Sequence, residues 1–337
     1  MSEVIMCLPA DTRIAHFKSV FDMVDMCITL LRNHQFMLLE SSEAATKEGR
    51  KEFGMDTRYR VQPRCIGTYT IRSSTFICAE TEEICVANNT MDYSDHQECR
   101  DLNLSVEIFI NDAIFDDLLQ LLDRNKVLRS VFLKEVNEQS VNGEGVISGL
   151  YKEFRKEEKK NLWKGQAELE AFFKQHGVID RYVSGEHGFN ELYTYRAIAI
   201  FQHIEEVHEI AFGVATDILK EKGSLTDILK SYLEEVHQFS LLCKRDFLNT
   251  NTVQGRFKFD FVRLANSNFT LNYTEVYNTE GFEVELFHTD WQKELIEGLV
   301  RQYGKSLVGL ARFFSRAQIS ALYRSTRYKE TASSQKG

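Results

Sequence analysis

Proline is nearly absent from the 337-residue chain, which contains only Pro9 and Pro63. Since proline interrupts helix interiors, its absence after residue 63 permits long helices there. No apolar run reaches the roughly 18 residues that a membrane-spanning helix needs. The amino terminus also lacks the basic segment and the long apolar segment of a signal peptide. We therefore expect a cytoplasmic protein without a membrane partner.

Basic residues are in the minority, with 41 Lys and Arg against 50 Asp and Glu, which gives a formal net charge of −9. This charge opposes binding to a phosphate backbone, so we expect no nucleic-acid partner. The seven cysteines are an odd number scattered along a large chain, which favours reduced thiols over a disulfide framework. With 43% hydrophobic residues, the composition is that of a packed globular protein.

The first residues have the pattern of a strand–helix–strand unit. A short apolar run at 3–8 is typical of a buried strand, and Asp11 and Thr12 can cap the amphipathic helix that follows. A second apolar strand is expected at 35–39. Two parallel strands alone cannot cover both of their faces and edges. We therefore expect the missing strands to be lost or to be supplied by another chain.

The remaining sequence predicts an α+β chain that is mostly helical. Three-and-four spacing of apolar residues indicates helices in the middle of the chain, and period-two alternation at 256–262 and 282–287 indicates two strands. The expected segments are a strand–helix–strand unit at 1–54, a mixed connecting segment at 55–92, a helical domain at 93–246, a β-plus-helix piece at 247–324 and a disordered tail at 325–337.

Two segments resemble the last strand–helix–strand unit of a radical SAM barrel, which is a TIM-like fold. They are Leu8-Pro9-Ala10-Asp11-Thr12, which precedes a helix, and the run His34-Gln-Phe-Met-Leu-Leu-Glu-Ser-Ser-Glu43. In that family the first loop usually reads Leu-Pro-Gly-Glu-Thr. The second loop usually reads Leu-Pro-Gly followed by a small polar residue.

Later segments are similar to those that follow the barrel in cobalamin-binding radical SAM proteins: Lys51–Arg60, Pro63–Cys65, Glu82–Thr90, Cys99-Arg100, Phe287–Asp290 and Arg301–Leu310. The likeness covers most of the chain. It implies the carboxyl-terminal part of an enzyme that performs adenosyl-radical chemistry. The full-length family uses S-adenosylmethionine, a four-iron cluster and cobalamin, which accepts or donates a methyl group in many members.

The resemblance also implies which residues border the cofactor pocket: Leu8, Pro9, Ala10, Asp11, Thr12, Leu39, Glu40 and Ser41. Two departures from the family pattern fall in these loops. Ala10 stands where the family has glycine, and Glu40-Ser41 stands where it has Pro-Gly. A glycine would let the backbone approach a nucleotide closely, and a β-carbon hinders that approach.

The family's cluster motif, CxxxCxxC, is absent from the sequence. The nearest pair of cysteines is Cys78 and Cys85, and Cys99 is too far along the chain to complete a set of three ligands. The cobalamin-binding pattern Asp-x-His-x-x-Gly is absent too. We expect the parts that carry both to precede Met1, on an upstream partner chain or on a lost segment. The isolated chain is then expected to hold no cofactor and to have no radical activity of its own, and other enzymatic activity stays open.

Two readings do not depend on the resemblance. Glu205-x-x-His208 and Glu234-x-x-His237 lie on successive expected helices, which is the pairing that di-iron bundle proteins use. Such pairs also arise by chance on glutamate-rich amphipathic helices, where they form a solvated flank. The other alternative is a non-catalytic helical module that binds a partner protein.

Overall fold

The computed structural model describes residues 1–184, 187 and 190–330. The chain forms two compact units, one of Met1–Glu107 with Val141–Arg196, and one of Ile108–Ser140 with the chain from Ala197 onwards. Each unit therefore combines two separate stretches of sequence. The fold is α+β and mostly helical, as the sequence predicts.

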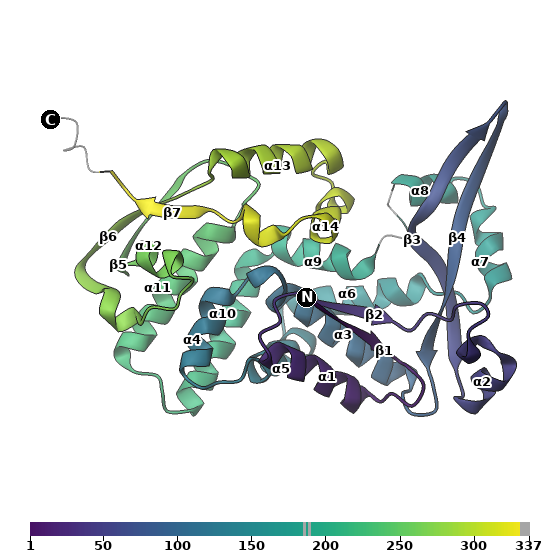
Figure 1. Ribbon diagram of the computed structural model, residues 1–337, viewed down its shortest axis with the longest axis horizontal. Coiled ribbons are helices and arrows are strands. Elements are labelled where there is room, and N and C mark those ends of the chain that lie inside the picture. Colours follow the sequence, from purple (N-terminus) through teal and green to yellow (C-terminus); the bar gives the residue numbers. More distant parts are fainter. Residues whose placement is uncertain (185–186, 188–189, 331–337) are drawn as a thin grey trace. The chain divides into compact units, whose positions relative to one another are not determined.

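The first unit contains three helices in its first stretch, two pairs of strands, and helices from its second stretch (Figure 1). In chain order its elements are β1 (Ser2–Met6), α1 (Arg13–Asp25), β2 (Leu31–Gln35), a 3₁₀ turn (Glu43–Ala45), α2 (Lys47–Glu52), β3 (Asp56–Ile71), β4 (Ser74–Ala87), α3 (Tyr93–Phe109), α6 (Val146–Lys160), α7 (Gln166–Phe173), α8 (Val178–Ser184) and the start of α9 (Glu191–Gln202).

The strand–helix–strand unit expected at the start of the chain is present. β1 and β2 pair in parallel along their whole length, and the Thr12 hydroxyl caps α1 by accepting a hydrogen bond from the Ala15 N–H. β2 ends where we expected the second strand, 35–39, to begin. The physical reason is that the Phe36 N–H still donates to Met6 of β1, whereas its carbonyl and the Leu38 N–H already bond to β4.

Helices α1 and α3 pack on one face of the β1–β2 pair. Met6 of β1 lies in an apolar cluster with Phe17 of α1 and Cys99 of α3. Because side chains alternate along a strand, Ile5 points to the opposite face, where it is 46% exposed. Helices α1 and α3 thus cover one face. The opposite face, called the uncovered face below, is largely exposed, and Arg32 on it donates to the Tyr193 hydroxyl of α9 at 2.6 Å.

Strands β3 and β4 form one long antiparallel hairpin, within the mixed connecting segment that the sequence predicted at 55–92 (Figure 1). The hairpin joins the parallel pair just after β2, because the Leu38 N–H donates to the Glu83 carbonyl (2.8 Å) and the Cys85 N–H donates to the Phe36 carbonyl (2.9 Å). The strand order is therefore β1–β2–β4–β3. Helices α7 and α8 pack against β3 through one apolar cluster: Val61, Leu169, Phe173, Val178 and Tyr182.

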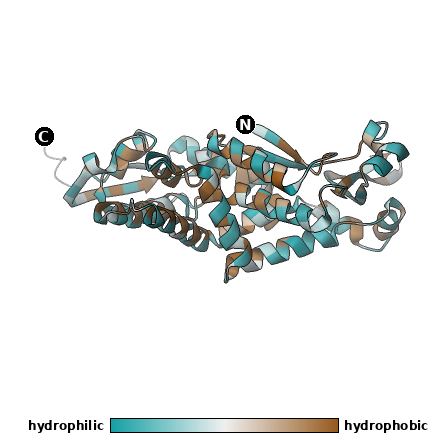
Figure 2. Ribbon diagram, turned by 90° about the horizontal axis from the view of Figure 1, so that it is seen from below, coloured by the Kyte–Doolittle hydropathy of each residue, from teal (hydrophilic) through white to brown (hydrophobic). Residues whose placement is uncertain are grey.

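The second unit packs helices against a three-stranded sheet. Its elements are a 3₁₀ turn (Asn111–Ala113), α4 (Asp116–Arg124), α5 (Arg129–Asn142), the end of α9, α10 (Ile204–Glu221), α11 (Asp227–Lys244), β5 (Val253–Phe259), α12 (Phe261–Asn266), a 3₁₀ turn (Tyr273–Val276), β6 (Tyr277–Phe287), α13 (Asp290–Tyr303), α14 (Leu307–Arg316), a 3₁₀ turn (Ile319–Leu322) and β7 (Ser325–Tyr328). Figure 2 shows hydrophilic and hydrophobic residues on different sides of single helices, as in amphipathic helices.

The sheet of the second unit is antiparallel, in the order β5–β6–β7. Two of its strands, β5 and β6, match the alternating segments in the sequence. β7 is a correction, because Ser325–Tyr328 falls in the expected disordered tail of 325–337. The Arg324 side chain before it donates to four backbone carbonyls, at 2.6 to 3.1 Å, and so holds the start of this segment against the end of α11 and the loop after it. β7 itself pairs with β6. Residues 331–337 of the expected tail lie outside the described residues.

A buried ion pair joins two helices of the second unit. The Lys244 ammonium of α11 contacts an Asp117 carboxylate oxygen of α4 at 2.9 Å and the Ser240 hydroxyl at 2.6 Å. The two charged side chains are only 6% and 5% exposed.

None of the helices in the described part of the chain is long and apolar enough to cross a membrane.

We predict that Lys244→Met destabilises the protein by about 3 kcal/mol, because it leaves the Asp117 carboxylate buried without its partner. Adding Asp117→Leu should recover most of this loss, since the uncompensated charge is then removed. Urea unfolding monitored by circular dichroism measures both effects. Arg245→Ala is the matched control, because Arg245 and its partner Glu205 are 50% and 46% exposed. Equal losses in Lys244→Met and Arg245→Ala would contradict the prediction.

Candidate functional site

The loops that follow β1 and β2 lie at the same edge of the parallel pair. In α/β sheets, ligands bind beyond the carboxyl ends of the strands. The first loop, Leu8–Thr12, follows β1, and the second loop, Leu39–Ser42, follows the extended segment after β2. These loops contain all eight residues that the sequence assigned to a cofactor pocket.

The first loop is held by its own aspartate and by the end of the hairpin. The two Asp11 carboxylate oxygens accept from the Cys7 N–H (3.1 Å) and the Thr12 N–H (2.9 Å). The Asn88 amide donates to the Leu8 carbonyl at 3.0 Å, and the Thr90 hydroxyl donates to the Asp11 carbonyl at 2.5 Å. The loop is therefore braced by residues about 80 positions further along the chain.

Both loops contain a non-glycine residue in a backbone conformation that glycine favours. Ala10 has φ of +63° and Ser41 has φ of +70°. An L-residue in this region brings its β-carbon close to the backbone, at a cost of roughly 1–2 kcal/mol. These are the two positions where the sequence departs from the family's glycines. At both positions the backbone therefore has a geometry that glycine favours, although the residue is not glycine.

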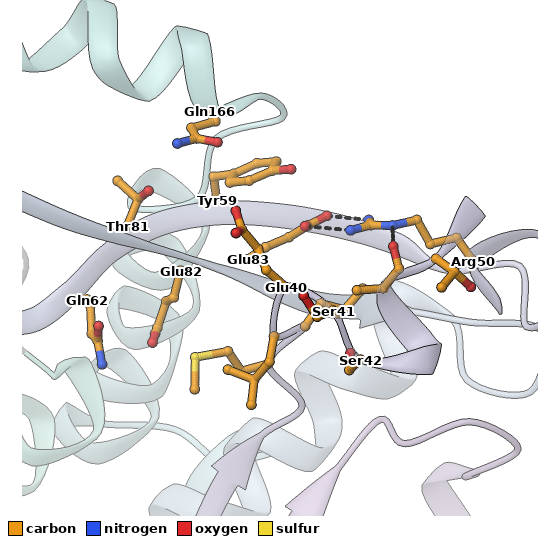
Figure 3. Close-up of a pocket in the computed structure, with 15 residues that line it drawn as sticks. Glu40, Ser41, Ser42, Arg50, Tyr59, Gln62, Thr81, Glu82, Glu83 and Gln166 are labelled. Carbon is orange, nitrogen blue, oxygen red and sulfur yellow. Dashed lines mark hydrogen bonds and ion pairs between the residues drawn. The ribbon is translucent and has the colours of Figure 1, made fainter. Parts of the chain in front are cut away.

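The second loop lines a cavity of about 630 Å³, a size typical of small-molecule sites. Figure 3 shows Glu40, Ser41 and Ser42 on one side of the β3–β4 hairpin strands, and Tyr59 and Gln166 on the other. The lining residues come from the second loop and its neighbours, α2, the hairpin and α7: Met37, Leu38, Leu39, Glu40, Ser41, Ser42, Ala45, Thr46, Arg50, Tyr59, Gln62, Thr81, Glu82, Glu83 and Gln166. The first loop does not line this cavity.

An ion pair forms one wall of the cavity. The Arg50 guanidinium binds both Glu83 carboxylate oxygens, at 2.5 and 2.7 Å, and donates to the Ala45 carbonyl at 2.9 Å. The hydrogen bond from Arg50 lowers the pKa of Glu83, and burial raises the pKa of Tyr59 beside it. The carboxylate of Glu83 is thus ionised, and the guanidinium of Arg50 neutralises its charge.

Three cysteines meet beside the first loop without forming a ligand set. Cys7 and Cys85 are fully buried with their sulfur atoms 3.6 Å apart, and Cys99 belongs to the same apolar cluster. The hydrogen bond to Cys85 raises the pKa of Cys7 and lowers that of Cys85, while burial raises the pKa of Cys99. Buried sulfur atoms that hydrogen-bond to each other and to a backbone carbonyl inside an apolar cluster do not fit an iron–sulfur cluster, whose ligands are thiolates facing the cluster. No group of three metal-ligating side chains occurs among the described residues.

Two buried histidines lie where α1 and α3 meet. The His16 Nε2 contacts the Asn103 side-chain oxygen at 3.0 Å, and His96 is 2% exposed. Burial lowers the pKa of both, to about 3 for His96. Both rings are therefore neutral at physiological pH.

The four candidate metal ligands of the helical region are not brought together. His208 is buried, with Nδ1 2.8 Å from the Ile204 carbonyl and Nε2 3.3 Å from the Ser240 hydroxyl, and its ring stacks near that of His237, with centroids 6.0 Å apart. Glu205 instead lies at the surface, where it pairs with an arginine. Glu234 is exposed as well.

Most of the cavity lining was not identified from the sequence. Leu39, Glu40 and Ser41 were named, whereas Arg50, Tyr59, Gln62, Glu82 and Glu83 were not. The hairpin does carry a usable signal, because the basic residue Arg60 faces the acidic residue Glu82 on the opposite strand. Opposite charges across paired strands indicate the register, and the register brings these side chains to the second loop.

Comparison with known proteins adds no relative. A scan against protein-family models finds no match, and a search of the curated proteins finds no significant one.

We predict that Ala10→Gly and Ser41→Gly each stabilise the protein by about 0.5–1 kcal/mol, because glycine adopts a positive φ without strain. Chemical unfolding measures the change. Ala171→Gly is the matched control, since Ala171 is an exposed position in α7, where glycine should cost about 0.5–1 kcal/mol. If all three variants lose stability to the same extent, the two loops do not have the left-handed conformation.

The low pKa of His96 should make stability fall in acid. An unfolded histidine titrates near pH 6.5, whereas the pKa of His96 is lowered to about 3. Between these values the unfolded chain binds more protons, so the free energy of unfolding decreases as the pH falls, by at most ~1.4 kcal/mol per pH unit. His96→Gln should reduce this slope in urea unfolding, and His176→Gln, at an exposed position, should not. An unchanged slope in His96→Gln would rule out this contribution.

Proposed function

We propose that this chain is the carboxyl-terminal part of a radical SAM enzyme of the cobalamin-binding type. Its strand–helix–strand unit would then be the last part of the barrel, and the first and second loops would border the cofactor pocket. The main support is the positive φ of Ala10 and Ser41. A glycine-like backbone is retained at the two positions where the resembling family has glycine, and neither residue type requires it.

The uncovered face of the parallel pair also supports the proposal. Parallel strands are almost always covered on both faces. Ile5 is 46% exposed on this face, and its same-face neighbours Glu3 and His34 have side chains that are 58% and 52% exposed. Among the described residues β1 also pairs with no strand other than β2. A further piece of α/β barrel would cover this face and extend the sheet at the free edge of β1.

The residues of this chain do not fit the family's iron–sulfur cluster or cobalamin. The cluster motif is absent, and the buried thiols of Cys7, Cys85 and Cys99 lie in an apolar cluster rather than in an open ligand set. A partner chain or a preceding segment would have to supply both groups. The contribution of this chain would be to position the cofactor with the braced backbone of the first loop and the second loop.

A non-catalytic module that binds a partner protein is the second candidate. The same uncovered face favours it, because an exposed apolar side chain between polar ones suits an interface with any α/β partner. The two candidates differ in whether the partner brings a cluster. They also differ in whether loop changes affect the cofactor.

Anaerobic co-expression with the reading frame immediately upstream tests the proposal. We expect iron and sulfide in the purified complex and neither in the chain alone, and cobalt where cobalamin is supplied. Ile5→Arg should abolish co-purification, because it places a charge on the uncovered face. Ile14→Arg is the matched control, since Ile14 is 73% exposed on α1, the helix that covers the other face.

The outcomes separate the candidates. A stable complex without iron and sulfide would favour the module and contradict the enzyme. Association that survives Ile5→Arg but is lost in Ile14→Arg would mean that the uncovered face is not the contact surface. Iron without sulfide in the chain alone would instead favour a di-iron site in the helical region.

A further inference from the structure

We propose that the cavity beside the second loop binds a small cationic ligand that carries several hydroxyl groups, of the amino sugar class. The cavity is built entirely from the first unit, so binding can be tested on this chain alone. Whether such a ligand is also a substrate depends on the proposed function above, but its binding does not.

The charges in the cavity wall select against anions. The lining contains three carboxylates, from Glu40, Glu82 and Glu83, and one guanidinium, from Arg50. Arg50 is already paired with Glu83 through two hydrogen bonds, and Glu82 is paired with Arg60 at 2.5 Å. No cation of the lining is left to bind a phosphate or a carboxylate. Negatively charged ligands are therefore disfavoured.

Glu40 supplies the charge that would hold a cation. It is exposed at the start of the second loop, and within the described residues its carboxylate takes part in no ion pair or hydrogen bond. Figure 3 shows it between Ser41 and the hairpin residues of the lining. An ammonium group in the cavity would donate to this carboxylate, and charge-assisted hydrogen bonds of this kind are about twice as strong as neutral ones.

Neutral polar groups provide the hydrogen bonds for hydroxyls. Five such side chains line the cavity and make no hydrogen bond to another described residue: Ser41, Ser42, Gln62, Thr81 and Gln166. Hydroxyl and amide groups both donate and accept, and a sugar hydroxyl also does both. This set therefore matches a polyhydroxylated ligand better than an apolar one.

The floor of the cavity and its size are consistent with a saturated ring. Met37, Leu38, Leu39 and Ala45 contribute apolar surface, and Leu39 is 59% exposed. Covering Leu39 with the C–H face of a ring would remove apolar area from water. The volume of about 630 Å³ accommodates a ligand of one or two such rings.

Ligand-observed NMR and titration calorimetry on the isolated chain test the proposal, with glucosamine, glucose and glucose 6-phosphate as probes at about pH 6, where the amine is protonated. We expect glucosamine to bind most tightly and glucose 6-phosphate not to bind. Glu40→Gln should weaken glucosamine binding about tenfold and leave glucose unaffected. Glu43→Gln is the matched control, because Glu43 is an exposed carboxylate of the same segment that does not line the cavity.

Three results would overturn the proposal: no binding of any probe, tighter binding of the phosphate, or equal losses in Glu40→Gln and Glu43→Gln. Gln166→Ala is a second variant at an exposed position, and it should weaken the binding of glucosamine and glucose alike. These results do not depend on an upstream partner. Failure of the cavity proposal would thus leave the metal analysis of the complex unaffected, and the reverse also holds.

Discussion

The connection between the segment after β2 and β4 is the constraint on which the first unit depends. Two backbone hydrogen bonds, from Leu38 to Glu83 and from Cys85 to Phe36, turn a parallel pair and a separate hairpin into one arrangement of four strands. A two-stranded hairpin alone is marginally stable in water. The same connection places Glu83 beside the second loop, where its carboxylate holds Arg50. The cavity is therefore a consequence of how the two pairs of strands are joined.

The sequence predicted the elements whose cause is local. The Thr12 cap, the amphipathic helices and the alternation that became β5 and β6 all depend on residues close together in the chain. The long hairpin was not predicted, because its register depends on pairs such as Arg60 with Glu82, which are 22 positions apart. For the same reason the second loop was identified in the sequence while most of the cavity that it lines was not. The division into two units could not be predicted from the sequence either, because each unit combines two stretches that are far apart along the chain.

The two Glu-x-x-His motifs show why spacing alone does not decide a metal site. Three-residue spacing puts both side chains on one side of a helix, but the neighbouring elements determine which of them is buried. His208 turns into the core, where its ring centroid lies 4.8 Å from that of Phe115 and burial lowers its pKa well below the usual value. Glu205 remains at the surface with Arg245. A neutral histidine that bonds a backbone carbonyl and a serine is a satisfied core residue.

The uncovered face does not endanger the stability of the first unit, because Val4 and Met6 are buried on the other face, which α1 and α3 cover. The uncovered face could therefore bind a partner without any prior unfolding of the first unit. Ile5 lies on this face in the strand that leads into the first loop, and His34 lies on it in the strand that leads towards the second loop. A partner that covers these side chains reaches the carboxyl ends of both strands, which is where α/β sheets bind ligands. Partner binding and ligand binding would therefore affect each other through the two loops.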